Sequence, residues 1–449
     1  MNIPPIKNAL ENITEACERK LSHLYPAGIP AKIRTRYEQE LSFLKISGHT
    51  DDFEIYRLLS EEAAKSSYIM TARGTLMGSF LYYLLGTNCF NPLPVYYYCP
   101  QCGHYEPIQT HLFGIDLPEK KCPNCNASIY ADGFNLSIES VWGLDGKKLI
   151  SFDYNVCSEF LPFAKRILTT LYPNNVVAPW GLFELDSVTN SPYPDQRAIG
   201  VNLVGYAILP TGNHIDDYSD FVSYLEDGDT CLTGGGWELE QSHIKPIRLF
   251  TMPLIENLIK LQRATGVYAN ELPPNTLRDI TWSNIYNSTI LCQHTSMLFH
   301  EFKPKNFRDM VALEASSHNT TTWPKDVESR ISLFDFKQMI STESFQKYPC
   351  FTREDFFDYL IETGVDRETA FVASEMIRKG RASEKVKASL KEKFEALNIP
   401  EEIREVAKYY LYLFPRAHCI EYALIYARLA YYAKLDSRAF SKIIFKKKG

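Results

Sequence analysis

Apolar residues recur at helical spacing near the start of the chain. From Leu10 to Leu24 they follow one another at steps of three or four residues, until Pro26-Ala27-Gly28 ends the pattern. This spacing places the apolar side chains on one face and predicts an amphipathic helix. Residues 34–66 show a similar pattern, and we expect a break at Gly48-His49-Thr50.

The middle of the chain changes to short apolar or alternating runs. Lys148–Tyr154 and Val204–Leu209 have this pattern, and Pro210 follows the second run. Such runs predict strands. Residues 216–236 are polar and rich in glycine, so we expect a loop there.

From about Leu249 onward the pattern is mostly helical. We expect loops at residues 316–324 and 347–351, and sustained helical spacing from Glu401 to Lys442. A region of mixed strands followed by a helical region predicts an α+β protein.

Composition and charge narrow the function classes. The 449 residues are 45% hydrophobic and 23% charged, typical of a folded protein, and no apolar run approaches the ~18 residues of a membrane span. The net charge is −6, yet residues 371–449 hold 17 Lys and Arg against 9 Asp and Glu. This basic segment is a candidate nucleic-acid surface. The alternative is a set of solvated helix faces with a lysine tail, Lys446–Lys448.

The most specific local motif is a pair of Cys-x-x-Cys sequences. Nineteen residues separate Cys102 from Cys122. This spacing predicts one structural Zn²⁺ held by four thiolates, Cys99, Cys102, Cys122 and Cys125. The alternative is a pair of disulfides, but the N-terminus shows no secretory signal pattern, which favours reduced cysteines and a cytoplasmic location.

Four stretches, taken together and in this order, resemble one known family. They are Arg73–Ser79, Asn91–Pro94 leading into Cys99, Ile377–Gly380 and Phe414–Tyr422. Their order and spacing resemble the PolC-type replicative DNA polymerase III alpha subunit, a family C DNA polymerase. In that family they correspond to an Arg-Gly-Ser loop, an Asn-Pro-Leu-Pro lead into a zinc site, an Arg-Lys-Gly segment and a Phe-Pro-Lys-Ala-His segment.

The resemblance implies a specific α+β layout. It predicts a palm-like mixed sheet of the nucleotidyltransferase type, an inserted four-cysteine zinc module and a C-terminal helical fingers domain. The expected bounds are a helical lead-in at 1–60, a palm-like domain at 61–95 and 132–260, a zinc module at 96–131, and a fingers-like domain at 261–449.

The resemblance also locates the catalytic carboxylates of the family. An Asp-x-Asp pair on one strand would place both carboxylates on the same face. Here Asp153 matches the second Asp, and Ser151 stands at the first position. The third carboxylate aligns near Arg248, or toward Met252 if a gap is allowed, and neither residue is acidic. The nearest acids are Glu238 and Glu240. Asp153 on its own is also consistent with a polar residue at a strand end.

These substitutions change the functional expectation. Two-metal nucleotidyl transfer needs a carboxylate cluster to hold Mg²⁺, and each charge lost there weakens metal binding by several kcal/mol at an effective dielectric of ~20. We therefore expect a pseudo-polymerase that binds single-stranded or primed DNA or replication proteins, with no membrane association. Its role would be to recruit, mimic or inhibit a replisome, or to serve in phage or mobile-element defence. The alternatives are an active DNA polymerase that uses Mg²⁺, either alone or with a partner subunit, and a zinc-stabilised interaction module with no nucleic-acid role.

Several cationic and loop residues would bind nucleotide or DNA if the resemblance holds. Backbone amides ahead of a helix and Arg or Lys side chains suit phosphate. An Arg-Gly-Thr turn is also common as an ordinary helix entry, and a histidine at a helix start is often a core residue. The candidates are Arg73, Gly74, Thr75, Ser79, Arg378, Lys379, Arg381, Arg416 and His418.

Overall fold

The computed structural model describes most of the chain. The described residues are 3–185, 198–225, 227–269, 293–321, 333–378, 394–407 and 410–445, together with residue 392 and short pieces between 272 and 291. Within this part of the chain, no helix combines the length and apolarity that crossing a bilayer requires.

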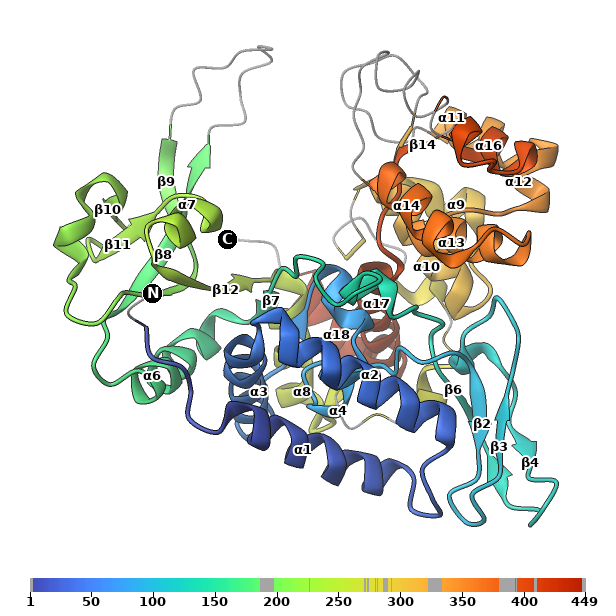
Figure 1. The fold of residues 1–449 in the computed structure, drawn as a ribbon, viewed down its shortest axis with the longest axis horizontal. Helices are drawn as coiled ribbons and strands as arrows, with labels where there is room; N and C mark the ends of the chain where they lie inside the picture. Colours follow the sequence, from blue (N-terminus) through green and yellow to red (C-terminus); the bar gives the residue numbers. More distant parts are fainter. Residues whose placement is uncertain are drawn as a thin grey trace.

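Three helices form the N-terminal part, as the apolar spacing predicts. They are α1 (Ala9–Leu24), α2 (Ala31–Ser47) and α3 (Thr50–Lys65). Gly48 ends α2 with a φ of 76°, a left-handed conformation that glycine adopts without strain. The predicted break therefore falls where the structure has one (Figure 1).

A seven-stranded mixed sheet forms the centre and one side of the molecule (Figure 1). Its order is β1-β7-β12-β9-β8-β11-β10, with β7–β12 and β8–β11 parallel and the other pairs antiparallel. The strands are β1 (Thr71–Ala72), β7 (Asp153–Val156), β8 (Val177–Leu185), β9 (Ala198–Ile208), β10 (Val222–Tyr224), β11 (Thr230–Thr233) and β12 (Lys245–Thr251).

Two predictions about this region are wrong in part. The strand expected at 148–154 begins only at Asp153, because residues 148–152 have no ladder partner and Leu149 is 93% exposed. The loop expected at 216–236 contains β10 and β11. Strand β10 lies at the edge of the sheet and has no buried residue, so polar side chains conceal its pattern. Strand β11 is largely buried, but its apolar run is too short to stand out in the sequence.

Two small sheets surround the four cysteines. β2 (Tyr96–Tyr98) pairs with β3 (Tyr105–Pro107) and β6 (Ala131–Asp132), and β4 (Lys120–Lys121) pairs with β5 (Ser128–Ile129). Their own buried core has only six residues, Val95, Tyr97, Cys99, Cys122, Ile129 and Ala131. Figure 1 shows these strands at the end of the molecule opposite β10 and β11.

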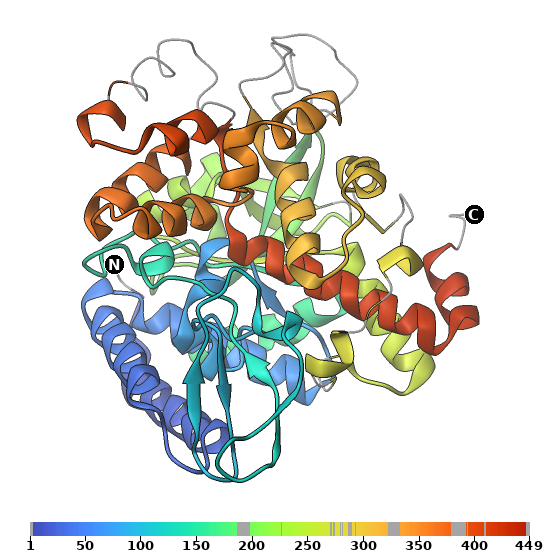
Figure 2. The same ribbon diagram turned by 90° about the vertical axis from the view of Figure 1, so that its right-hand side faces the viewer.

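The remaining helices alternate with the strands in the first part of the chain and make up most of its C-terminal part. Helix α17, drawn in red, runs through the middle of the molecule (Figure 2). The earlier ones are α4 (Phe80–Leu84), α5 (Glu139–Trp142), α6 (Leu161–Leu171), α7 (Gly236–Gln241) and α8 (Pro253–Thr265). The later ones are α9 (Gln293–Phe302), α10 (Phe307–His318), α11 (Leu333–Ile340), α12 (Glu343–Lys347), α13 (Arg353–Glu362), α14 (Arg367–Arg378), α16 (Glu401–Ala407), α17 (Arg416–Leu435) and α18 (Ser437–Ile444).

The helical pattern expected from Glu401 to Lys442 is interrupted. Strand β14 (Tyr410–Tyr412) separates α16 from α17 and pairs with β13 (Thr320–Thr321). Pro415 then stands at the N-cap of α17. A residue before proline is disfavoured in the helical region, so the chain cannot continue as one helix here.

Candidate functional site

Asp153 and Arg248 are direct partners in the parallel ladder of β7 and β12. Asp153 is the first residue of β7, so its side chain lies where the strand emerges from the preceding irregular segment. The alignment with the family predicts a third carboxylate near residue 248. The structure places a guanidinium beside Asp153 instead.

Both oxygens of the Asp153 carboxylate have protein neighbours. The Ser151 hydroxyl donates a hydrogen bond of 2.7 Å to Oδ2, and Arg248 Nε lies 3.6 Å from Oδ1. The side chains of Asp153 and Arg248 are 30% and 22% exposed, so the pair lies at the surface rather than in the core. The carboxylate therefore already has a cation of the chain itself as its ion-pair partner.

The surroundings of Arg248 hold its guanidinium in place. Its central carbon lies 5.7 Å from the ring centroid of Trp180, and Nη2 lies 4.0 Å from Glu240 Oε1. A Cβ at Gly236 would lie 1.9 Å from Nη2, so only glycine leaves room for the side chain in this position. Nothing in the sequence indicated that Trp180 and Gly236 contact Arg248. Neither residue is charged, and neither belongs to a recognised motif.

Tyr56 joins the two strands beneath this pair. Its hydroxyl accepts a hydrogen bond from the Arg248 backbone N–H at 3.1 Å and donates to the Phe152 carbonyl at 3.0 Å. Its ring stacks on Tyr154 with centroids 4.1 Å apart. Burial raises the pKa of Tyr56 well above its usual value, so the hydroxyl stays protonated and can make both contacts.

The nearby acids do not complete a metal site with Asp153. Glu238 accepts a hydrogen bond of 2.7 Å from the Gly235 backbone N–H and so caps α7, while Glu240 faces Arg248. Among the described residues, one group of three or more His, Cys, Asp or Glu side chains has metal-binding spacing, and it is the four-cysteine cluster.

The Arg73-Gly74-Thr75 turn lies directly beside Asp153. The Arg73 backbone N–H donates a hydrogen bond of 2.8 Å to the Asp153 carbonyl, and its guanidinium lies 5.0 Å from the centroid of the Phe250 ring. Gly74 has a φ of 69° and donates its N–H to Nδ1 of His418 at 3.2 Å. The turn therefore connects the sheet to the first turn of α17.

His418 is a neutral, buried acceptor. Burial, reinforced by the nearby His318 and Arg73, lowers the pKa of His418 from 6.5 to about 3. A neutral ring leaves Nδ1 able to accept the Gly74 hydrogen bond. The structure thus brings two of the candidate nucleotide-binding residues, Gly74 and His418, into direct contact with each other.

Acidification is expected to destabilise the protein through His418. Below pH 6.5 the unfolded chain binds a proton that the folded chain excludes until about pH 3, so stability falls as the pH drops through this window. At pH 5.5 the expected loss from this group is about 1.4 kcal/mol. Urea unfolding at pH 8.0, 6.5 and 5.5 measures it.

A matched pair of variants isolates this contribution. His418→Gln removes the titrating ring, so the fall in unfolding free energy between pH 8.0 and 5.5 should shrink by about 1.4 kcal/mol. His23 is an exposed histidine in α1, and His23→Gln should leave the pH profile unchanged. An unchanged profile in His418→Gln would contradict the prediction.

Ser79 makes a different contact from the one a phosphate would require. It is fully buried, and its hydroxyl donates a hydrogen bond of 2.6 Å to Glu40 Oε2. Glu40 also accepts the backbone N–H groups of Phe80 and Leu81, at 3.0 and 3.3 Å. A carboxylate of the chain itself therefore occupies the N-terminus of α4, the position where the sequence suggested an anion site.

Arg416 lies away from His418, although the two are only two positions apart on α17. Residues at this spacing do not face each other on a helix. The Arg416 Nη2 atom contacts Asp355 Oδ1 at 2.8 Å and Asp358 Oδ2 at 2.7 Å. Burial alone would raise the pKa of Asp355, but the guanidinium groups of Arg308 and Arg416 outweigh it and hold that pKa at about 2. Arg416 is therefore the centre of a buried ion network.

Most of the other cationic residues predicted to bind DNA are not among the residues that the structure describes. Lys379 and Arg381 are not among the described residues, and Arg378 is described only as the last residue of α14. Thr75 lies in the 3-10 helix η1 (Gly74–Gly78), next to Gly74. The proposal that these residues contact nucleic acid rests on the sequence.

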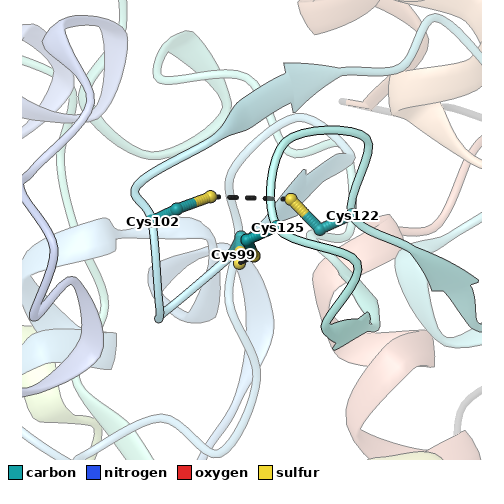
Figure 3. Close-up of side chains that lie close together, drawn as sticks. All are labelled: Cys99, Cys102, Cys122 and Cys125. Atoms are coloured by element: carbon teal, nitrogen blue, oxygen red, sulfur yellow. Dashed lines mark hydrogen bonds between the residues drawn. The ribbon is translucent and has the colours of Figure 1, made fainter.

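The four cysteines converge on one point from two loops (Figure 3). All four sulfur atoms lie within 4.8 Å of one another, with Cys99–Cys125 at 3.4 Å and Cys102–Cys122 at 3.5 Å. A tetrahedral Zn²⁺ with bonds of ~2.3 Å requires sulfur atoms about 3.8 Å apart. The donor set and its spacing fit one such ion.

Known proteins match this chain in amino-acid sequence. The family model for the bacterial DNA polymerase III alpha NTPase domain matches residues 11–184. PolC-type DNA polymerase III of Thermotoga petrophila is 23% identical over 96% of the chain, and that of Bacillus subtilis is 24% identical over 96%. The corresponding protein of Caldanaerobacter subterraneus is 23% identical over 98%.

By these matches the chain is similar to bacterial DNA polymerase III alpha subunits. More specifically, it resembles the alpha core of the PolC type. The chain spans about a third of the length of the curated relatives it matches, because the match covers 34% of the Thermotoga petrophila protein and 32% of the Bacillus subtilis protein.

Proposed function

We propose that this protein is a PolC-like pseudo-polymerase, which binds DNA or replication proteins and does not transfer nucleotides. The observation that carries the proposal is the ion pair between Asp153 and Arg248, at two positions where the family alignment expects carboxylates. Within this proposal the seven-stranded sheet corresponds to a palm, residues 96–131 to a zinc module and the later helices to fingers.

Charge explains why this arrangement opposes metal catalysis. Two Mg²⁺ ions in a polymerase site are balanced by several carboxylates. Here the carboxylate of Asp153 faces the guanidinium of Arg248, and Ser151, at the first carboxylate position of the family, is uncharged. A dication entering the site would have to displace Arg248 and would meet its positive charge, which costs several kcal/mol at an effective dielectric of ~20.

A primer-extension assay tests the catalytic half of the proposal. With a primed DNA template, all four deoxynucleotides and Mg²⁺ or Mn²⁺, the protein is expected to add no nucleotide above background. Extension that disappears in Asp153→Ala would contradict the proposal and support an active polymerase. Adding host replication proteins to the same reaction tests the version in which a partner is required.

A binding assay tests the nucleic-acid half. Fluorescence anisotropy with a primed template is expected to show binding that weakens as salt rises, because Lys and Arg displace counterions from phosphates. The double variant Arg378→Ala/Lys379→Ala should weaken binding about tenfold, whereas Arg19→Ala/Lys20→Ala in α1 should not. Identical affinities for the two double variants would favour an interaction module without a nucleic-acid role.

We further propose that the four cysteines bind one structural Zn²⁺. Four thiolates leave no open coordination position, so the ion would hold the two loops together and take no part in chemistry. The support is the convergence of the sulfur atoms and the six-residue core around them.

A further inference from the structure

Strand β10 forms one edge of the seven-stranded sheet, and within the described part of the chain it has a neighbouring strand on one side only. Figure 1 shows it at the opposite end of the molecule from β2 and β3. A sheet edge presents backbone N–H and C=O groups with which another chain can pair. This edge is therefore a candidate interaction surface.

The hydrogen bonds of the β10–β11 hairpin show which backbone groups face outward. The Leu225 N–H donates to the Asp229 carbonyl at 2.9 Å, so these two residues form a hydrogen-bonded pair. Such pairs alternate with non-hydrogen-bonded pairs in an antiparallel ladder, and Tyr224 and Thr230 form the next pair. The N–H and C=O groups of Tyr224 therefore point away from β11. Among the described residues, they make no hydrogen bond to another element.

The exposed side chain beside this edge is aromatic. Residues two positions apart on a strand share a face, as Val222 and Tyr224 do on β10. Val222 packs against the small core that contains Trp180 and Leu232, whereas Tyr224 is 66% exposed. A strand added at this edge would cover part of the Tyr224 ring with its own side chains.

The part of the chain that carries this edge, residues 198–244, is acidic throughout, and we call it the acidic lobe. It contains eight Asp and Glu but no Lys or Arg, whereas the whole chain has a net charge of −6. The rest of the chain therefore has a net charge of +2. Asp220 and Asp229 flank β10 and are exposed, and their side chains make no hydrogen bond or ion pair within the described part of the chain.

This charge distinguishes between the possible occupants of the edge. Nucleic acid has the same sign and would be repelled. A second copy paired edge to edge would bring two acidic lobes together, and like charges that face each other across a ladder destabilise it. A basic strand would be attracted by the acids and could pair with the free backbone groups.

We propose that β10 is a docking edge for an extended, lysine- or arginine-rich segment of a partner protein, which adds to the sheet as a further strand. Affinity comes from the backbone hydrogen bonds at Tyr224, and selectivity for a basic segment comes from the acidic lobe. This inference goes beyond the proposed pseudo-polymerase function and does not depend on it.

Three synthetic peptides test the proposal on the unmodified chain. One alternates lysine and valine, the second is the same peptide with a central proline, and the third alternates glutamate and valine. The lysine–valine peptide is expected to bind. The proline keeps the charge but removes a ladder hydrogen bond, so it should raise the Kd about tenfold or more. The glutamate–valine peptide should not bind, and hydrogen exchange at the Tyr224 amide should slow only with the lysine–valine peptide.

A matched pair of double variants locates the binding surface. Asp220→Lys/Asp229→Lys reverses two charges beside β10 and should raise the Kd of the lysine–valine peptide about tenfold or more. Glu11→Lys/Glu15→Lys makes the same change at exposed positions of α1 and should leave the Kd unchanged.

Four results would overturn the proposal. They are equal Kd values for the lysine–valine and proline peptides, equal effects of the two double variants, the absence of binding, and exchange at the Tyr224 amide that slows with protein concentration alone. The last result would indicate a second copy of the chain at this edge.

Discussion

Replacing Cys102 with serine is expected to release the metal ion and unfold the region from Tyr96 to Asp132. The core around the cysteines has six buried residues, too few to fold without a cross-link. In small zinc-binding peptides, metal binding supplies about 10–16 kcal/mol of apparent folding energy. Losing one thiolate of four should remove most of that contribution, while the seven-stranded sheet keeps its own core.

Two measurements check this result. Elemental analysis should give one zinc per chain for the wild type and almost none for Cys102→Ser. Hydrogen exchange should accelerate in residues 96–132 and remain slow in β7 and β12. Cys231 is fully buried and lies outside the cluster, so Cys231→Ser should keep its zinc. Equal zinc content in the two serine variants would contradict a metal site at these cysteines.

The elements that local patterns determine were predicted well. The helical periodicity of residues 10–24 reflects one buried face, and the structure has α1 over Ala9–Leu24. The two Cys-x-x-Cys motifs also bring four sulfur atoms together, since each motif needs only a tight turn. Strand β10 escaped prediction because none of its three residues is buried, so its pairing with β11 defines it and an apolar pattern does not.

The candidate site was predictable only where the family alignment reached it. That alignment indicated Asp153 and a position near Arg248, and the register of β7 and β12 places them side by side. It gave no indication of Tyr56, Trp180 or Gly236. These three residues act by packing around the pair, and no charge or motif distinguishes a tyrosine, tryptophan or glycine that does so from any other.

Polar residues at helix starts were the hardest to interpret. Ser79 and His418 both resembled phosphate ligands in sequence, yet each contacts a partner within the protein: Ser79 contacts Glu40, and His418 contacts Gly74. A helix N-terminus attracts any negative group. Whether that group is a ligand or a carboxylate of the same chain depends on the tertiary fold, which places α2 beside α4.

A chain carrying both Ser151→Asp and Arg248→Asp is expected to bind Mn²⁺ beside Asp153, where the wild type binds none. The two changes replace a hydroxyl and a guanidinium with carboxylates. At ~4 Å and an effective dielectric of ~20, each unit charge interacts with a dication by about 8 kcal/mol before desolvation is counted. Even a small net fraction of this energy should improve Mn²⁺ affinity more than about 100-fold. Electron paramagnetic resonance of bound Mn²⁺ measures it.

Two control variants separate charge from incidental effects. Ser151→Asp alone keeps Arg248, so the cation still occupies the site and Mn²⁺ binding should stay absent. Adding Asp153→Asn to the double variant should abolish the gained binding, because the carboxylate at the centre of the pair is lost. If Ser151→Asp bound Mn²⁺ as well as the double variant does, Arg248 would not be what excludes the metal. If Mn²⁺ binding appears only when Arg248 is replaced, the fold can still accommodate a metal site, and the Arg248 guanidinium is what prevents one from forming.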